Sequence, residues 1–130
     1  MTDKARFLDG SGKAERSIIN LSGKIAAAPM AGEGTAVFDE WRQTIDVARR
    51  ARVERIVLIT TPFHPSLRAA IASERLAAFR RQVRAFASDV GCEYVDFLDF
   101  QVPDAGWRDG NHLNTMGAAL FTPACRKAVE

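Results

Sequence analysis

Two short predicted strands separated by a long amphipathic stretch constrain the fold of this chain most. Residues 55–61 read RIVLITT, and their four consecutive apolar residues without alternation are typical of a parallel strand that is buried on both faces. Residues 93–97, which read EYVDF, are predicted to form the next strand. Between the runs, apolar side chains recur at steps of three and four and predict a helix over 66–90 that is capped by Gly91: Leu76, Phe79, Val83, Phe86 and Val90. This order is typical of a β-α-β unit.

Other segments extend the same alternation. Residues 17–21 (SIINL) predict a further strand, and the spacing from Phe38 predicts a helix that ends near Arg52. A last helix is expected over 114–129, with Asn114 as its N-cap. With right-handed crossovers, this order gives an α/β fold, a three-layer parallel sheet with helices on both faces of the flavodoxin-like kind.

The length and charge narrow the class of protein. A chain of 130 residues makes a single domain, in which we expect residues 1–16 to be loosely ordered and 17–130 to form the core. The formal net charge of +2 and arginines on a predicted helix face do not indicate a nucleic-acid partner. No apolar run approaches the roughly 20 residues of a membrane span. Without a signal peptide the chain is expected to be cytoplasmic as written, or in the cell envelope or secreted if it belongs to a longer precursor.

Candidate site residues fall in the loops that follow the predicted strands. In parallel α/β sheets, ligands bind beyond the carboxyl ends of the strands, and both histidines of the chain lie in such loops. Asp109 precedes His112 by three residues, so its carboxylate can accept a hydrogen bond from Nδ1–H of the imidazole. That bond would leave Nε2 as a general base. We therefore expect His112 and Asp109 to be catalytic.

Weaker candidates lie beside this pair. His64 and Asn111 are candidates for substrate binding, although a rigid turn between two prolines also accounts for His64. Trp107 fits either a cleft wall or a loop anchored on the core. No metal site is expected, because the spacing of four aspartates in this region matches no EF-hand: Asp96, Asp99, Asp104 and Asp109.

The carboxy-terminal half resembles a known superfamily. Residues 107–121, WRDGNHLNTMGAALF, look like the carboxy-terminal block of SGNH (GDSL-type) hydrolases, in which an Asp-x-x-His loop opens the last helix. Residues 56–65, IVLITTPFHP, resemble the preceding strand and loop, so the resemblance covers about residues 55–130. The family's Gly-Asp-Ser block is absent, since no serine here follows Gly-Asp. The resemblance therefore implies an incomplete SGNH fold whose nucleophile is unknown.

That resemblance also implies a chemistry. A serine would attack an ester while His112 takes its proton, with water as acceptor in an ester hydrolase or a sugar hydroxyl in an O-acyltransferase. The substrate would be a small ester or an acylated carbohydrate, and no cofactor is required. The alternative is a catalytically inactive α/β module for binding or assembly. Because three strands leave a sheet edge unsatisfied, we expect a homo-oligomer or a missing complementary segment.

Overall fold

A computed structural model of the chain describes residues 28–34 and 36–130. They fall into two compact units, which are described separately. The first holds residues 29–34, 36–60 and 73–96, and the second holds 61–72 and 97–130 together with Ala28. The predicted strand over 17–21 and the predicted loose start over 1–16 lie outside the described residues.

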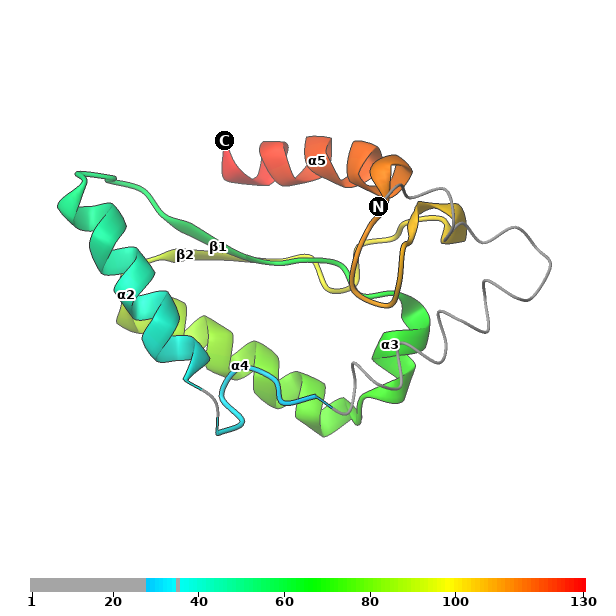
Figure 1. Ribbon diagram of the computed structural model, residues 1–130, viewed down its shortest axis with the longest axis horizontal. Helices are drawn as coiled ribbons and strands as arrows, with labels where there is room; N and C mark the ends of the chain where they lie inside the picture. Colours follow the sequence, from blue (N-terminus) through cyan, green and yellow to red (C-terminus); the bar gives the residue numbers. More distant parts are fainter. Residues whose placement is uncertain (1–27, 35) are drawn as a thin grey trace. The chain divides into compact units, whose positions relative to one another are not determined.

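The first unit contains a parallel pair of strands. Strand β1 (Val57–Thr60) pairs with β2 (Glu93–Asp96), with Val57 opposite Glu93 and Thr60 opposite Asp96. Figure 1 shows the two strands running together along their length. Both strands lie within the predicted runs, and parallel pairing across an intervening helix agrees with an α/β class. In the part of the chain that is described, the sheet has these two strands.

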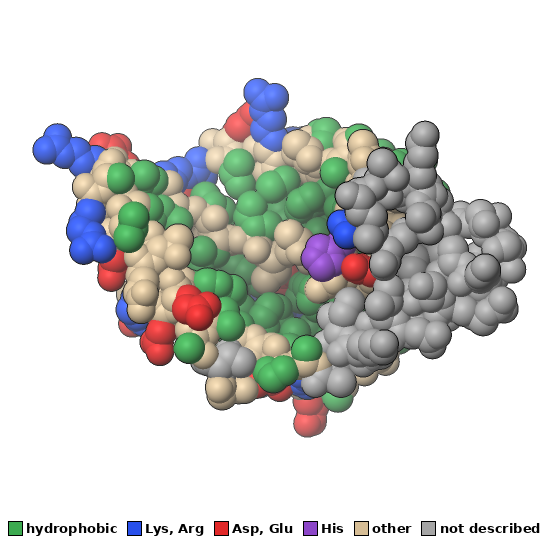
Figure 2. All heavy atoms as spheres, viewed as in Figure 1, with side chains coloured by type: hydrophobic (Ala, Val, Ile, Leu, Met, Phe, Trp, Pro, Cys, Tyr) green, Lys and Arg blue, Asp and Glu red, His purple; other side chains and the backbone are tan. Residues whose placement is uncertain are grey.

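Two helices accompany this sheet. They are α2 (Val37–Arg50) and α4 (Ser73–Asp89). Their facing sides share an aromatic cluster, in which Phe38 stacks on Phe86 with ring centroids 4.9 Å apart and Trp41 meets Phe86 edge-on at 5.9 Å. The predicted cap at Gly91 is confirmed, because its φ of 70° is the left-handed conformation that glycine adopts freely. Side chains of both charges are interspersed over α2 in Figure 2, as a solvated helix face requires.

The prediction that β1 is buried on both faces is wrong. Val57, Leu58 and Ile59 are each partly exposed, and within this strand only Thr60 is buried, at 7% exposure. The physical reason is the width of the described sheet, which gives β1 a single strand neighbour. A continuous apolar strand is fully buried only when it has a neighbouring strand along each edge and helices that cover both faces of the sheet.

The helix predicted over 66–90 is also wrong as one element. The structure has two helices there, α3 (Pro65–Ala70) and α4, separated at Ile71 and Ala72. Ile71 is extended, with φ −94° and ψ 131°, and its side chain is 6% exposed. The buried side chain favours the extended conformation at Ile71, so tertiary packing overrides the local periodicity.

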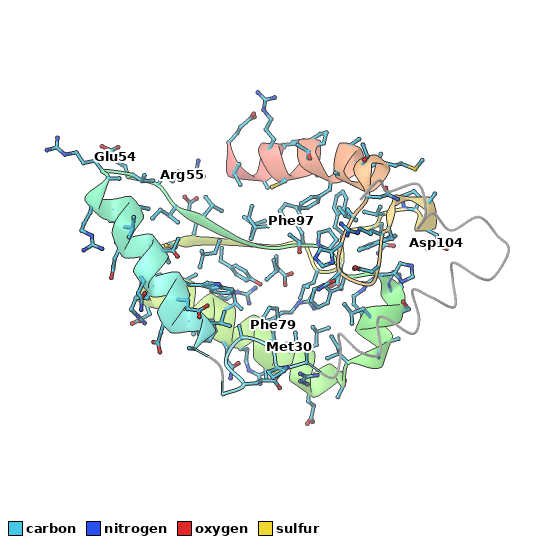
Figure 3. All side chains as sticks on the ribbon, in the orientation of Figure 1. Met30, Glu54, Arg55, Phe79, Phe97 and Asp104 are labelled. Carbon is cyan, nitrogen blue, oxygen red and sulfur yellow. The ribbon has the colours of Figure 1, made fainter. Side chains whose placement is uncertain are left out.

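The second unit holds α3, the short 3-10 helix η2 (Asp104–Gly106) and α5 (Thr115–Val129). Trp107 and Leu98 are among its most buried side chains, at 0% and 1% exposure, and Trp107 forms a core cluster with Val102. Three phenylalanine rings meet edge-on with centroids 5.1 to 6.1 Å apart: Phe97, Phe100 and Phe121. Figure 3 labels Phe97 at the start of the loop that leads to η2.

The start of α5 follows the prediction. The side chain of Asn114 accepts a hydrogen bond from the backbone N–H of Gly117 at 3.1 Å, which is the bond of an N-cap. Gly117 in turn lies against the backbone of Gly106, and a β-carbon on Gly117 would overlap the carbonyl oxygen of Gly106. Among the helices that the structure describes, none combines the length and apolar character needed to cross a membrane.

Candidate active site

The loop before α5 is closed by its own backbone. Trp107 and Leu113 form an isolated antiparallel bridge, and the N–H of Arg108 donates to the carbonyl of His112 at 2.9 Å. The buried indole of Trp107 donates from Nε1 to the carbonyl of Val102 at 3.1 Å, which ties the loop to the core. Residues 108–112 are therefore presented as a tight turn on a fixed base. For Trp107, this arrangement supports the reading as a loop anchor.

Asp109 organises this turn. Its Oδ1 accepts the backbone N–H groups of Asn111 at 3.0 Å and His112 at 2.9 Å. The same carboxylate lies 2.9 Å (Oδ1) and 3.0 Å (Oδ2) from Nδ1 of the His112 ring. The Asp109 side chain is only 16% exposed, so its orientation is set by these backbone donors. The hydrogen bond expected from the Asp-x-x-His spacing is present.

The orientation of His112 follows from this contact. An ionised carboxylate is a pure acceptor, so Nδ1 carries the proton and the neutral ring keeps its lone pair on Nε2. The His112 side chain is 64% exposed, which leaves Nε2 accessible. Chemically, this is a positioned imidazole that can accept a proton from a hydroxyl group.

Asn111 lies within the turn, and His64 contacts it. Asn111 has a buried side-chain oxygen, Oδ1, with no hydrogen-bond partner among the described residues. A buried acceptor left open in this way costs free energy unless something else donates to it. His64 reaches the turn through its backbone, since its N–H donates to the carbonyl of Gly110 at 2.8 Å. The structure therefore brings both predicted substrate-binding residues next to the Asp109 turn.

The His64 ring makes contacts that the sequence did not reveal. Its Nδ1 lies 2.7 Å from Oγ of Ser66 and accepts the backbone N–H of Ser66 at 3.1 Å. Its Nε2 lies 3.1 Å from Oδ1 of Asp104, which Figure 3 labels at η2. Trp107 meets the ring edge-on at 5.3 Å. The spacing of His64 and Ser66 was a visible signal, whereas Asp104, forty residues away, carried none.

A second polar cluster lies in the other unit, at the carboxyl ends of its strands. Thr60 Oγ1 donates to Oδ1 of Asp96 at 2.9 Å and lies 3.2 Å from the hydroxyl of Tyr94. Burial raises the pKa of the Tyr94 hydroxyl, and its hydrogen bond with Thr60 partly offsets this. Arg80 lies 2.8 Å from Asp96 and neutralises its charge. The cluster has its own internal partners and supports the ends of the two strands.

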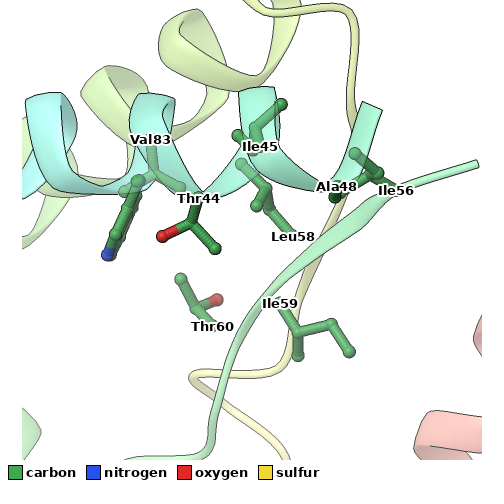
Figure 4. A pocket seen from close by; sticks show the side chains of 9 residues that line it. Thr44, Ile45, Ala48, Ile56, Leu58, Ile59, Thr60 and Val83 are labelled. Carbon is green, nitrogen blue, oxygen red and sulfur yellow. The ribbon is translucent and has the colours of Figure 1, made fainter. Parts of the chain in front are cut away.

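The same unit has an apolar pocket of about 270 Å³. Figure 4 shows Thr44, Leu58 and Thr60 around it. Its lining comes from α2, α4 and the region of β1: Trp41, Thr44, Ile45, Ala48, Ile56, Leu58, Ile59, Thr60 and Val83. With no charged residue in this lining, the pocket suits an apolar group.

Neither metal sites nor known relatives add to this picture. Within residues 28–34 and 36–130, no three His, Cys, Asp or Glu side chains group closely enough to hold a metal ion. The chain matches no family model, no curated protein and no solved structure. What it does is therefore inferred from its own geometry.

Proposed function

We propose that this chain carries the Asp–His half of an acyl-transfer site of the SGNH (GDSL-type) kind and acts as an ester hydrolase or O-acyltransferase. The proposal rests on the hydrogen bond from Nδ1–H of His112 to the Asp109 carboxylate, with Nε2 of the same ring accessible. The two residues have the relative placement of the acid and base in a Ser-His-Asp triad. The proposed fold is the corresponding three-layer α/β scaffold.

The proposed roles follow from the positions of the two side chains. Nε2 of His112 takes the proton from the attacking hydroxyl group, and the imidazolium that forms returns it to the leaving alcohol. Asp109 keeps the ring in the productive tautomer and stabilises the positive charge. Because two backbone N–H groups hold its carboxylate, Asp109 does not have to reorganise during the reaction.

No residue of the Asp109 turn is proposed as the nucleophile. The Gly-Asp-Ser block of the superfamily does not occur in this sequence. A serine from a complementary segment or a second copy would complete the triad. With an activated ester, water itself serves as the nucleophile, so the dyad is testable in the chain as it stands.

The acceptor decides between the two activities. Water gives hydrolysis, and a sugar hydroxyl gives an acylated carbohydrate. Both routes use the same base, so the dyad supports them equally. Product analysis by mass spectrometry, with a small acetylated sugar as donor and a free sugar as acceptor, separates release of acetate from transfer.

The direct test is hydrolysis of p-nitrophenyl acetate by the purified chain and by the His112→Asn variant. A positioned general base contributes about 10²-fold or more, so we expect His112→Asn to lose the protein-dependent rate by about that factor. His64→Asn and Ser66→Ala are measured alongside, so that any hydrolysis that depends on the other imidazole of the chain is separated from that of His112. A rate that is unaffected by His112→Asn, or is absent in a folded sample, contradicts the proposal and favours the inactive binding or assembly module.

A further inference from the structure

We propose that Ser66, His64 and Asp104 form a second hydrogen-bonded relay in which Ser66 is an activated nucleophile toward esters and related acyl or phosphonyl electrophiles. This inference does not depend on Asp109 or His112. The contacts that carry it run from Ser66 Oγ to His64 Nδ1 at 2.7 Å and from His64 Nε2 to Asp104 Oδ1 at 3.1 Å. The hydrogen bonds thus connect the serine to the histidine and the histidine to the aspartate, as they connect a nucleophile, its base and the acid that orients the base.

The tautomer of His64 is fixed by the backbone. The N–H of Ser66 donates to Nδ1 at 3.1 Å, so in the neutral ring Nδ1 is the acceptor and Nε2 carries the proton. Nε2–H then donates to the carboxylate of Asp104. The Ser66 hydroxyl lies 2.7 Å from the same Nδ1, and in this tautomer the hydroxyl is the donor in their hydrogen bond. Activation of a serine by a neighbouring base needs this direction of donation.

The ring is also held in place. The His64 side chain is 12% exposed, it meets the buried Trp107 edge-on at 5.3 Å, and its backbone N–H is tied to Gly110. A ring fixed in this way does not have to be ordered when a substrate arrives. Ser66 itself is partly exposed.

The chemical step balances without any further reagent. The Ser66 oxygen forms a bond to the carbonyl carbon of an ester, and its proton passes to Nδ1 of His64. The leaving alkoxide takes that proton as the ester C–O bond breaks, and water later hydrolyses the acyl-serine. With a fluorophosphonate, the oxygen bonds to phosphorus, fluoride leaves and the proton stays on His64.

The same contacts also fit a purely structural role, because His64 is the N-cap of α3. The test therefore uses His64→Asn, since asparagine is among the best N-cap residues and keeps an acceptor for the Ser66 N–H but is not a base. Asp104→Asn is the second variant. It removes the charge from a side chain that is 68% exposed, so it does not threaten the fold.

The experiment is labelling of the full chain with a fluorophosphonate probe, followed by peptide mapping and measurement of the labelling rate of each serine. We expect Ser66 to be labelled at least about 100-fold faster than the exposed serines of α4, Ser73 and Ser88. His64→Asn removes this advantage, and Asp104→Asn lowers the rate. His112→Asn leaves it unchanged, which separates this inference from the proposed function.

Two results overturn the inference. One is labelling of Ser66 no faster than labelling of Ser73 and Ser88, which identifies the contacts as a helix cap alone. The other is fast labelling that persists in both His64→Asn and Asp104→Asn. Circular dichroism of each variant confirms folding, and if His64→Asn does not fold, the rate in Asp104→Asn decides.

Discussion

The Asp109 carboxylate contacts both the backbone N–H and the ring of His112. The Oδ1 atom lies 2.9 Å from both the backbone nitrogen and Nδ1 of the histidine. One carboxylate oxygen thereby sets the shape of the turn and the tautomer of the imidazole. A change at Asp109 is expected to alter the base and the loop together, whereas a change at His112 is expected to remove the base and leave the turn closed.

The two histidines are expected to differ in reactivity. His112 is 64% exposed with Nε2 accessible, whereas His64 is 12% exposed with both ring nitrogens engaged. Diethyl pyrocarbonate should therefore modify His112 much faster than His64. Peptide mapping at partial modification measures the ratio. Equal rates would mean that the exposure or the contacts of one ring differ from those described.

Substitution of Gly117 tests the close contact at the start of α5. Helix propensity alone favours alanine over glycine by about 1 kcal/mol. Because a β-carbon would overlap the carbonyl oxygen of Gly106, we expect Gly117→Ala to destabilise the chain by about 1–3 kcal/mol instead. Urea unfolding measures the free energy.

The control for this prediction lies on the same helix. Ala119 is exposed, so Ala119→Gly reports the propensity difference without a packing change. It should cost about 1 kcal/mol. A Gly117→Ala variant more stable than the wild type would show that the backbones of Gly106 and Gly117 are not in contact.

The ion pair of Glu33 and Arg75 predicts a pH dependence of stability. Arg75 donates to both carboxylate oxygens at 2.7 and 2.8 Å and, with the N–H of Met30, lowers the pKa of Glu33 from 4.5 to about 2. A carboxyl group whose pKa is lower in the folded chain stabilises it fully above the unfolded value and progressively less as the pH falls toward the folded one. The contribution of Glu33 should therefore fade between pH 4.5 and about 2.

A mutant cycle measures this contribution. Unfolding midpoints of Glu33→Gln, Arg75→Gln and the double variant give the coupling of the two side chains. We expect coupling at pH 7 that disappears near pH 2. Coupling that does not change with pH would exclude titration of Glu33 as its source.

Trp107→Phe tests the anchor of the loop. Phenylalanine keeps an aromatic ring but cannot donate to the Val102 carbonyl, and it leaves unfilled volume beside a residue that is 0% exposed. We expect a loss of about 1–3 kcal/mol in the free energy of unfolding. Trp41→Phe, at a partly exposed position, should cost less. A neutral Trp107→Phe would mean that the indole does not fix the loop.

The parts of the fold that depend on nearby residues were predictable from the sequence. The runs that form β1 and β2, the N-cap at Asn114 and the Asp109–His112 bond all involve residues within a few positions of one another. Their signals are periodicity, capping chemistry and spacing, which act over one turn of chain. The catalytic roles and the three-layer arrangement stay predictions.

The features that were missed depend on contacts between distant residues. The break at Ile71 comes from burial of its side chain, which no helical period reveals. The partial exposure of β1 depends on how many strands flank it. Asp104 reaches His64 across forty residues of sequence. Tertiary packing decides each of these, so local patterns do not report them.

Asp109 and His112 are proposed to act together as one base, and a double-mutant cycle on ester hydrolysis measures whether they do. Groups that act as a unit give non-additive losses. We predict that Asp109→Asn and His112→Asn each reduce the protein-dependent hydrolysis of p-nitrophenyl acetate, and that the double variant is no slower than His112→Asn alone. Losses that multiply in the double variant, or an Asp109→Asn variant with the wild-type rate, would contradict the account.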